Sequence, residues 1–414
     1  MFLRKEYRWA ALLLLLSAGV LLYLLPTPLF VDEDNHYGQI VDFLGGHLKI
    51  SDGISMLPGY HFIMAVSLKT LGHHSVNFTR LVSTFYSLLT ILLFYALARQ
   101  QNPGQSLTKT LQCFFCPIVF PFLFLIYTDI FSLFWVLLSF YLVRMGKTNL
   151  SGLPILVGIL VRQTNIVWSV FMVGYVYLER FGLTFKRENI VQVFRLTWTH
   201  FVVYGLFLIF TVINRGISTG QKELHPTMSF HMDNIFFMLI VFFFLFLPYH
   251  IQTLQAAIAQ LKNKRALVAL VSFFVFYMLT FQNSHPWNQS HLIFNPVNPT
   301  ELQRAYPFLR NNLLAFIHSS IMLKALFFVP VVFSVLFLAR NGRALVPYIL
   351  MYFFTLVYLV PMWLIEPRYY IIPVVFFILL KEEQSTFIEN LQTVYFAILA
   401  VVLMSGIADM EFFL

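Results

Sequence analysis

The chain has 414 residues, of which 59% are hydrophobic and only 11% are charged, and its formal net charge is +9. A mean hydropathy of +0.77 excludes an ordinary soluble globular protein. The positive charge does not indicate nucleic-acid binding, because the basic residues lie in short loops between apolar segments, as the positive-inside rule describes for membrane proteins.

Apolar segments recur along nearly the whole chain, and most are roughly long enough to cross ~30 Å of hydrocarbon as a helix. Backbone groups in lipid must pair within their own segment. We therefore predict an all-α, polytopic bundle of about 12–13 transmembrane helices in a single membrane domain, residues 1–414. The expected segments are 9–25, 78–98, 111–127, 130–144, 150–161, 166–178, 197–213, 234–252, 266–281, 313–338, 344–361, 370–380 and 391–407.

The distribution of basic residues predicts the sidedness of the loops. The first segment follows Arg4 and Lys5 and is not followed by a small-residue cleavage site, so we expect an uncleaved helix with a cytosolic N-terminus. Basic clusters then fall in alternate loops, which we assign to the cytosol. Segment 57–71 is apolar enough to insert, but a crossing there would reverse every later loop. We expect a re-entrant or interfacial helix at this position, and a tight hairpin around Arg162.

Two further patterns depend on this topology. Cys113 and Cys116 form a CxxC inside an apolar segment, and we interpret them as small core residues rather than a redox pair or metal site. Glycosylation sequons begin at Asn77 and Asn288 on the predicted luminal side, whereas the sequon at Asn149 is predicted to be cytosolic.

The most informative polar cluster is Asp32-Glu33-Asp34, just after the first apolar segment. Carboxylates at a membrane surface are costly if they are partly desolvated, which favours a functional site. Glycosyl transfer with inversion needs one carboxylate to take the proton of the attacking hydroxyl, so Asp32 and Glu33 are candidate bases. The alternative is an acidic helix cap. The cluster also looks like the DxD of metal-dependent nucleotide-sugar enzymes, but those have soluble α/β domains.

Two arginines near apolar segments are candidate ligands for a lipid phosphate. Arg162 lies between two apolar segments, where a guanidinium is costly unless it is paired, and its planar donors suit a phosphate. Arg368 is a candidate to stabilise a phosphate leaving group. The alternatives are snorkelling for Arg162 and a simple ion pair with Glu366 for Arg368. The predicted luminal histidines do not have the spacing of a zinc site, and we predict no metal and no other cofactor.

Taken together, these motifs resemble the dolichyl-phosphate-glucose-dependent α-1,2-glucosyltransferases, which add the last glucose to the lipid-linked oligosaccharide of N-glycosylation. The most specific match is Arg-Gln-Thr-Asn-Ile-x-Trp at 162–168. The other matches are Asp-Glu-x-x-His-x-x-Gln at 32–39, Leu-Pro-Gly at 57–59, Tyr-Thr-Asp at 127–129, the loop 214–225, and Leu-Ile-Glu-x-Arg-Tyr at 364–369.

The resemblance implies a GT-C membrane fold in the endoplasmic reticulum membrane, with a luminal active site. The implied donor is dolichyl-phosphate-glucose, and the implied acceptor is the diglucosylated oligosaccharide on dolichyl diphosphate. With Asp32 or Glu33 as the base, the donor phosphate would face Arg368, Arg162, Lys222 and His225. The expected substrate-binding residues are His36, Gln39, Asp129, Gln163, Asn165, Glu366, Tyr369 and His285.

The chain departs from the family pattern in two places. Gln221 replaces an expected Asp, and the family's Asn-Arg-His-Tyr core is absent after His285-Pro286, where Trp287 to His291 follow. Acceptor recognition and activity therefore stay open at this point. The alternatives are a GT-C enzyme that uses another dolichyl-phosphate sugar such as mannose, a transporter, and a non-catalytic scaffold. Transporters often show internal repeats and polar residues near mid-membrane, and this chain has neither pattern.

Overall fold

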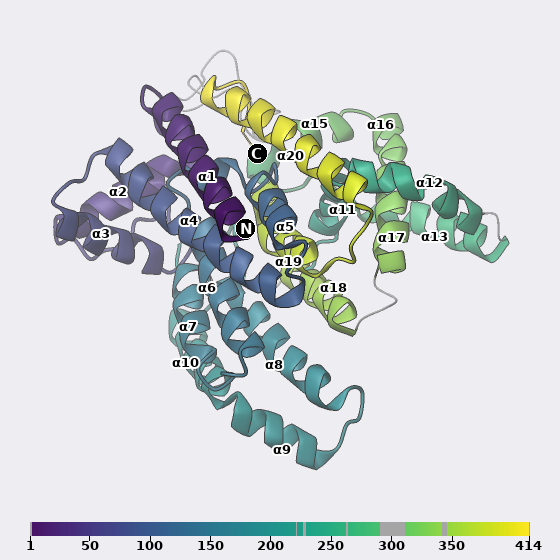
Figure 1. The fold of residues 1–414 in the computed structure, drawn as a ribbon, viewed down its shortest axis with the longest axis horizontal. Helices are drawn as coiled ribbons and strands as arrows, with labels where there is room; N and C mark the ends of the chain where they lie inside the picture. The colour runs from purple at the N-terminus through teal and green to yellow at the C-terminus, as the bar shows by residue number, and fades with distance from the viewer. Residues whose placement is uncertain are drawn as a thin grey trace. The chain divides into compact units, whose positions relative to one another are not determined.

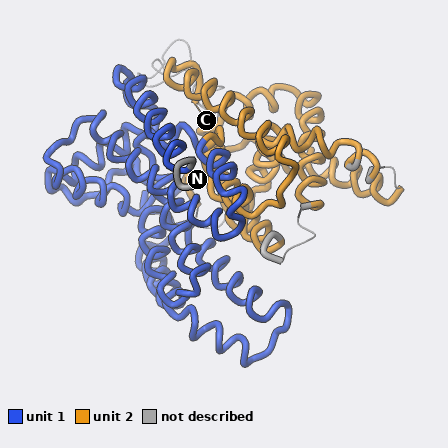
Figure 2. The backbone as a smooth tube through the Cα atoms, in the orientation of Figure 1, with its two compact units in different colours: residues 1–114, 119–222 blue, residues 115–118, 223–414 orange. Residues whose placement is uncertain are grey.

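The computed structural model describes residues 2–220, 222–226, 229–261, 264–289, 311–341 and 346–413. These residues form helices and no β-strand, which confirms the all-α prediction. The chain divides into two compact units (Figure 2). Unit 1 comprises residues 1–114 and 119–222, and unit 2 comprises residues 115–118 and 223–414.

Unit 1 holds the N-terminal helices (Figure 1). Within it, α2 packs on α3, α4 packs on α5 and α6, and α6 packs on α7. Its elements are α1 (Phe2–Leu24), α2 (Asp32–Leu44), α3 (Gly59–Leu71), α4 (Val76–Gln101), α5 (Ser106–Phe114), η1 (Pro121–Leu123), α6 (Thr128–Arg144), α7 (Gly152–Val161), η2 (Gln163–Asn165), α8 (Ile166–Phe181), α9 (Arg187–Leu196) and α10 (Trp198–Asn214).

Unit 2 is built around α11, which packs on α17, while α12 packs on α17 and α20. Its elements are α11 (Asp233–Leu245), α12 (Leu247–Leu261), α13 (Lys264–Thr280), η3 (Pro286–Gln289), α15 (Asn312–His318), α16 (Ile321–Leu326), α17 (Phe328–Asn341), α18 (Val346–Leu359), η4 (Pro367–Tyr370), α19 (Ile371–Leu380) and α20 (Thr386–Ala408).

The expected number of membrane spans is not reached in the described part of the chain. Four helices there are long and apolar enough to cross a membrane: residues 6–24, 76–101, 321–340 and 386–408. The count rises to six if each of two bent helix pairs is one span. These pairs are α9 with α10, bent by 79°, and α11 with α12, bent by 86°. Three more apolar helices, 152–161, 349–359 and 367–380, are shorter than a full crossing. The chain is therefore a polytopic helical membrane protein, and its described residues form fewer continuous spans than the apolar segments predict.

Prolines explain two of these interruptions. Segment 111–127 is not one helix, because α5 ends at Phe114 and Pro117 and Pro121 follow. Segment 234–252 breaks between α11 and α12, where Pro248 occupies the first turn of the new helix. Hydropathy detects apolar composition but not these breaks.

Helix α3 is a single helix of 13 residues over the ambiguous segment 57–71. At 1.5 Å per residue it spans about 20 Å, which is short of the hydrocarbon thickness. Its Tyr60, Met64 and Leu68 are buried in a hydrophobic cluster with residues from α2, α4 and α6. This length agrees with the expected re-entrant or interfacial helix.

Candidate active site

The three adjacent carboxylates occupy different environments in the first turn of α2. Asp32 is half-buried, Glu33 is completely buried and Asp34 is exposed. Acidic residues in a first turn interact favourably with the helix dipole, which accounts for part of their placement, although no side chain caps this helix. This interaction does not account for the burial of Glu33, which requires a partner.

That partner is Arg80 of α4, which sequence reasoning missed. Its Nη2 lies 2.6 Å from Glu33 Oε2 and its Nε donates to Oε1 at 3.1 Å. The backbone N–H groups of Phe30 and Ile126 also donate to the Glu33 carboxylate, at 2.9 and 2.8 Å. Glu33 is thus a fully hydrogen-bonded structural carboxylate. The available signal was an arginine in the third position of an expected membrane segment.

Arg80 also organises the connection between α1 and α2. It donates to the backbone oxygens of Leu24 and Pro28 at 3.1 and 2.7 Å, and to the Thr27 hydroxyl at 3.0 Å. Its guanidinium is only 1% exposed. The connection that precedes the acidic motif is therefore held by hydrogen bonds to a buried guanidinium group.

His36 and Gln39 are buried on the same helix. His36 Nδ1 lies 3.0 Å from Nε2 of His61 on α3, so one ring donates and the other accepts. Burial lowers the pKa of His61 to about 3, which keeps this ring neutral at physiological pH. The Gln39 amide accepts the Ser51 N–H at 2.6 Å and donates to Lys49 O at 3.1 Å. It thereby fixes the loop between α2 and α3.

The predicted site residues after α6 and α7 also pair with one another. Arg162 Nη2 lies 2.9 Å from Asp129 Oδ1, and its Nε donates to the Thr128 hydroxyl at 2.9 Å. Both charged side chains are largely buried. The ion pair explains how a guanidinium is accommodated between apolar segments, and it joins the motif at 162–168 to the motif at 127–129.

Gln163 and Asn165 hold backbone groups of neighbouring segments. Gln163 donates to Ser55 O and Ile217 O at 3.3 and 3.1 Å. Asn165 donates to the Ser132 hydroxyl and to Gly158 O, both at 2.7 Å. These two motif side chains therefore connect α6, α7, the loop before α3 and the loop after α10.

Two motif glycines permit close backbone contacts in the same region. A Cβ on Gly59 would lie 2.6 Å from Leu160 O, so only glycine fits against the end of α7. A Cβ on Gly220 would lie 2.7 Å from Ile54 O. Lys222 is exposed and donates to Asn214 O within the same loop.

In unit 2, Glu366 and Arg368 form a buried ion pair at the start of η4, with Nε donating to Oε2 at 2.5 Å. The Arg368 guanidinium also lies 5.8 Å from the ring centroid of the half-buried Tyr369. The simple ion pair considered from the sequence is thus present. It does not exclude a role toward phosphate, because a guanidinium carries five N–H donors.

Three asparagines that sequence reasoning did not identify as site residues hold the segment before this pair. Asn288 binds both the N–H and the C=O of Ile365, at 2.9 and 2.8 Å, and Asn311 donates to the same C=O at 2.7 Å. Asn234 donates to Met362 O and Leu364 O at 2.8 and 2.9 Å. Asn288, the first residue of a sequon, is therefore buried with its side-chain amide bound to the Ile365 backbone.

His285 is buried with partners on both ring nitrogens. Its Nδ1 accepts the Trp287 N–H at 3.1 Å, so Nε2 carries the proton and donates to Leu224 O at 3.3 Å. The ring of His225 lies 5.7 Å from that of Trp287. Of the diverged loop, residues 287–289 are described, whereas Ser290 and His291 lie outside the described residues, as does Gln221.

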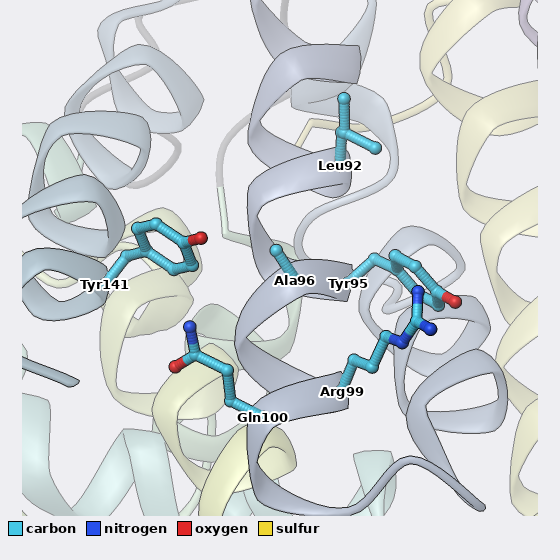
Figure 3. Close-up of a pocket in the computed structure, with 6 residues that line it drawn as sticks. All are labelled: Leu92, Tyr95, Ala96, Arg99, Gln100 and Tyr141. Carbon is cyan, nitrogen blue, oxygen red and sulfur yellow. The ribbon is translucent and has the colours of Figure 1, made fainter. Parts of the chain in front are cut away.

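A surface pocket in unit 1 lies apart from these motifs (Figure 3). It lies along the C-terminal turns of α4, whereas Arg80 and Glu33 are paired at the N-terminal end of that helix. Its lining residues are Leu92, Tyr95, Ala96, Arg99, Gln100 and Tyr141. None of the motif residues contributes to it.

Comparison with known proteins identifies related sequences. The profile of the DIE2/ALG10 family matches residues 26–190 and 180–379. A protein of Rattus norvegicus named Dol-P-Glc:Glc(2)Man(9)GlcNAc(2)-PP-Dol alpha-1,2-glucosyltransferase is 23% identical over 313 residues, which cover 62% of this chain and 66% of that protein. A Homo sapiens protein of the same name is 24% identical over 312 residues, with the same coverage.

A protein of the same name from Kluyveromyces lactis is 28% identical over 253 residues, which cover 53% of this chain and 45% of that protein. The chain thus spans just under two thirds of the length of the mammalian relatives, and less of the yeast one. No solved structure matches.

Proposed function

Because the chain belongs to the DIE2/ALG10 family, we propose that it is an inverting glucosyltransferase of the endoplasmic reticulum membrane. It transfers glucose from dolichyl-phosphate-glucose, in α-1,2 linkage, to the diglucosylated oligosaccharide on dolichyl diphosphate. The observation that carries the proposal is the family match over both units, joined to the placement of the acidic motif at the start of α2.

We assign the general base to Asp32. Glu33 already accepts two backbone N–H bonds and two bonds from Arg80 while completely buried, so protonating it would leave that arginine without its counter-charge. Asp32 is half-buried, as a group that must meet a substrate requires.

The reaction is a single in-line displacement. The acceptor hydroxyl oxygen attacks C1 of the donor glucose while Asp32 takes the hydroxyl proton. The bond from C1 to the phosphate oxygen breaks, and its electron pair leaves with dolichyl phosphate. The configuration at C1 is inverted.

Cationic side chains stabilise the leaving phosphate in this proposal. Arg162, Arg368, Lys222 and His225 are the candidates, and the carboxylates of Asp129 and Glu366 orient the two guanidinium groups. Because the leaving group is already a phosphate that such groups neutralise, we expect no metal requirement. Transfer that is lost on chelation and recovered with manganese would contradict this part.

The remaining motif residues are assigned to the substrate-binding region. They are His36, Gln39, Asp129, Gln163, Asn165, Glu366, Tyr369 and His285. The active site is expected on the luminal side and the N-terminus in the cytosol, from the loop charges.

The test is transfer in vitro by the purified full chain, with dolichyl-phosphate-glucose and the diglucosylated lipid-linked acceptor. Asp32→Asn should abolish transfer, whereas Asp34→Asn, on the same helical turn but exposed, should retain it. Dolichyl-phosphate-mannose in a parallel reaction tests the donor sugar. Absence of transfer from both donors by folded wild-type protein would refute an enzymatic function of this kind.

A further inference from the structure

The residue before Asp32 has an unusual backbone conformation. Val31 has φ 48° and ψ −108°, and the Glu33 N–H donates to Phe30 O at 2.9 Å. These are the angles and hydrogen bond of a type II′ turn with Val31 at its first central position, which strongly favours glycine. A β-branched residue there is a steric outlier, and such strain persists only where the surroundings over-determine it.

Tyr127 bridges the strained residue from both sides. Its buried hydroxyl donates to Phe30 O at 3.1 Å and accepts the Asp32 N–H at 3.1 Å. One oxygen atom therefore fixes the peptide groups that precede and follow Val31. Rotation of either peptide group, which would relieve the strain, would break one of these bonds.

The side chain of Glu33 closes the same turn from its other end. It accepts the Phe30 N–H at 2.9 Å and the Ile126 N–H at 2.8 Å, and Arg80 holds its carboxylate. The turn is thus attached to the segment 126–127 and to α4 by buried hydrogen bonds, and Asp32 lies within it.

We propose that Tyr127, with the Glu33–Arg80 pair, is a positioning residue that holds Val31 in this conformation in order to orient the Asp32 carboxylate. The inference rests on the proposed role of Asp32 as base. A displacement of about 1 Å at a reacting group costs on the order of 100-fold in rate, so a turn that has a single allowed geometry is useful beside a base.

The test is a cycle of Tyr127→Phe, Val31→Gly and the double variant in the full chain. Tyr127→Phe keeps the ring and should lower kcat at least tenfold, with little change in the KM of the donor. Glycine adopts the Val31 angles without steric cost. The kcat of Val31→Gly alone should therefore stay within about threefold of wild type. In the double variant, glycine at position 31 should restore most of the kcat lost in Tyr127→Phe. If Tyr127 acted only through packing, glycine at position 31 would not restore the kcat lost in Tyr127→Phe.

Thermal unfolding of the same four proteins gives a second measurement that needs no activity. Val31→Gly should raise the unfolding temperature, and it should raise it less in the Tyr127→Phe background, because loss of the two Tyr127 hydrogen bonds lets the turn relax and leaves less strain for glycine to relieve. Tyr86→Phe, which loses one hydrogen bond to Ser67 elsewhere in unit 1, is the matched control and should leave kcat unchanged.

Each outcome decides the inference. Unchanged kcat in Tyr127→Phe, a loss that Val31→Gly does not relieve, or a lower unfolding temperature in Val31→Gly would each overturn it. If wild type transfers no glucose, the proposed function fails while the thermal cycle still reports whether Val31 is strained and held by Tyr127.

Discussion

Replacement of Arg80 by methionine tests whether the acidic loop depends on a buried charge. Arg80→Met keeps an unbranched side chain but removes the partner of Glu33, whose carboxylate is 0% exposed. It also removes the donors to Leu24 O, Pro28 O and the Thr27 hydroxyl. The whole connection between α1 and α2 therefore loses its central contact.

The expected cost follows from this burial. Breaking a buried ion pair by removing one partner typically costs ~3–5 kcal/mol, because the other charge is left uncompensated. The double variant Arg80→Met with Glu33→Gln removes that charge, so it should be less destabilised than Arg80→Met alone. We expect a coupling of about 2–3 kcal/mol between the two sites.

The assay is thermal unfolding of the detergent-solubilised protein. With an unfolding entropy of about 2.1 cal/mol/K per residue, a chain of 414 residues shifts by ~1 °C per kcal/mol, so Arg80→Met should lower the unfolding temperature by about 3–6 °C. Arg99→Met is the matched control, because Arg99 is exposed near the other end of α4 (Figure 3), and it should change stability by less than about 0.5 kcal/mol. The reasoning is refuted if Arg80→Met is no less stable than this control.

Three further predictions use other contacts. The pKa of His61 is lowered to about 3 in the folded protein, so between about pH 6.5 and pH 3 the unfolded chain binds a proton that the folded one does not, and stability should fall as pH falls through this window. His61→Gln should reduce that slope, as measured by thermal unfolding from pH 7.5 to pH 4. Gly59→Ala would place a Cβ 2.6 Å from Leu160 O and should destabilise the protein by about 1–3 kcal/mol, measured in the same assay. Asn288 should carry no glycan in the folded protein, as determined by glycopeptide mass spectrometry, because its amide donates to Ile365 O.

Each of these has a control or a contradicting result. An unchanged pH slope in His61→Gln would show that this ring titrates normally. Gly38→Ala, in α2 with no atom within 4 Å of the added Cβ, should be neutral or stabilising, and an equal loss in both glycine variants would contradict the close-contact argument. A glycan at Asn288 would show that the segment before Glu366 is not held as described.

The number of membrane spans shows a limit of hydropathy as a predictor. The apolar segments predicted an all-α membrane protein correctly, because a lipid environment leaves few alternatives to a helix. They did not predict that segment 111–127 lacks a continuous helix or that segment 234–252 is sharply bent. Apolar composition indicates which segments are stable in a lipid environment. Local proline geometry and packing decide whether such a segment forms one straight helix.

The sequence by itself determined the family motifs, the apolar character of the chain and the acidic and basic groups that its proposed chemistry needs. It did not distinguish Asp32 from Glu33, because adjacent carboxylates are chemically alike until burial separates them. Only the tertiary structure shows that Arg80 pairs with Glu33, which is 47 residues away in the sequence. It likewise shows that the Tyr127 hydroxyl binds the backbone N–H of Asp32, which is 95 residues away. The physical reason is that a buried charge must find a counter-charge, and the residue that provides it is chosen by helix packing and not by distance along the chain.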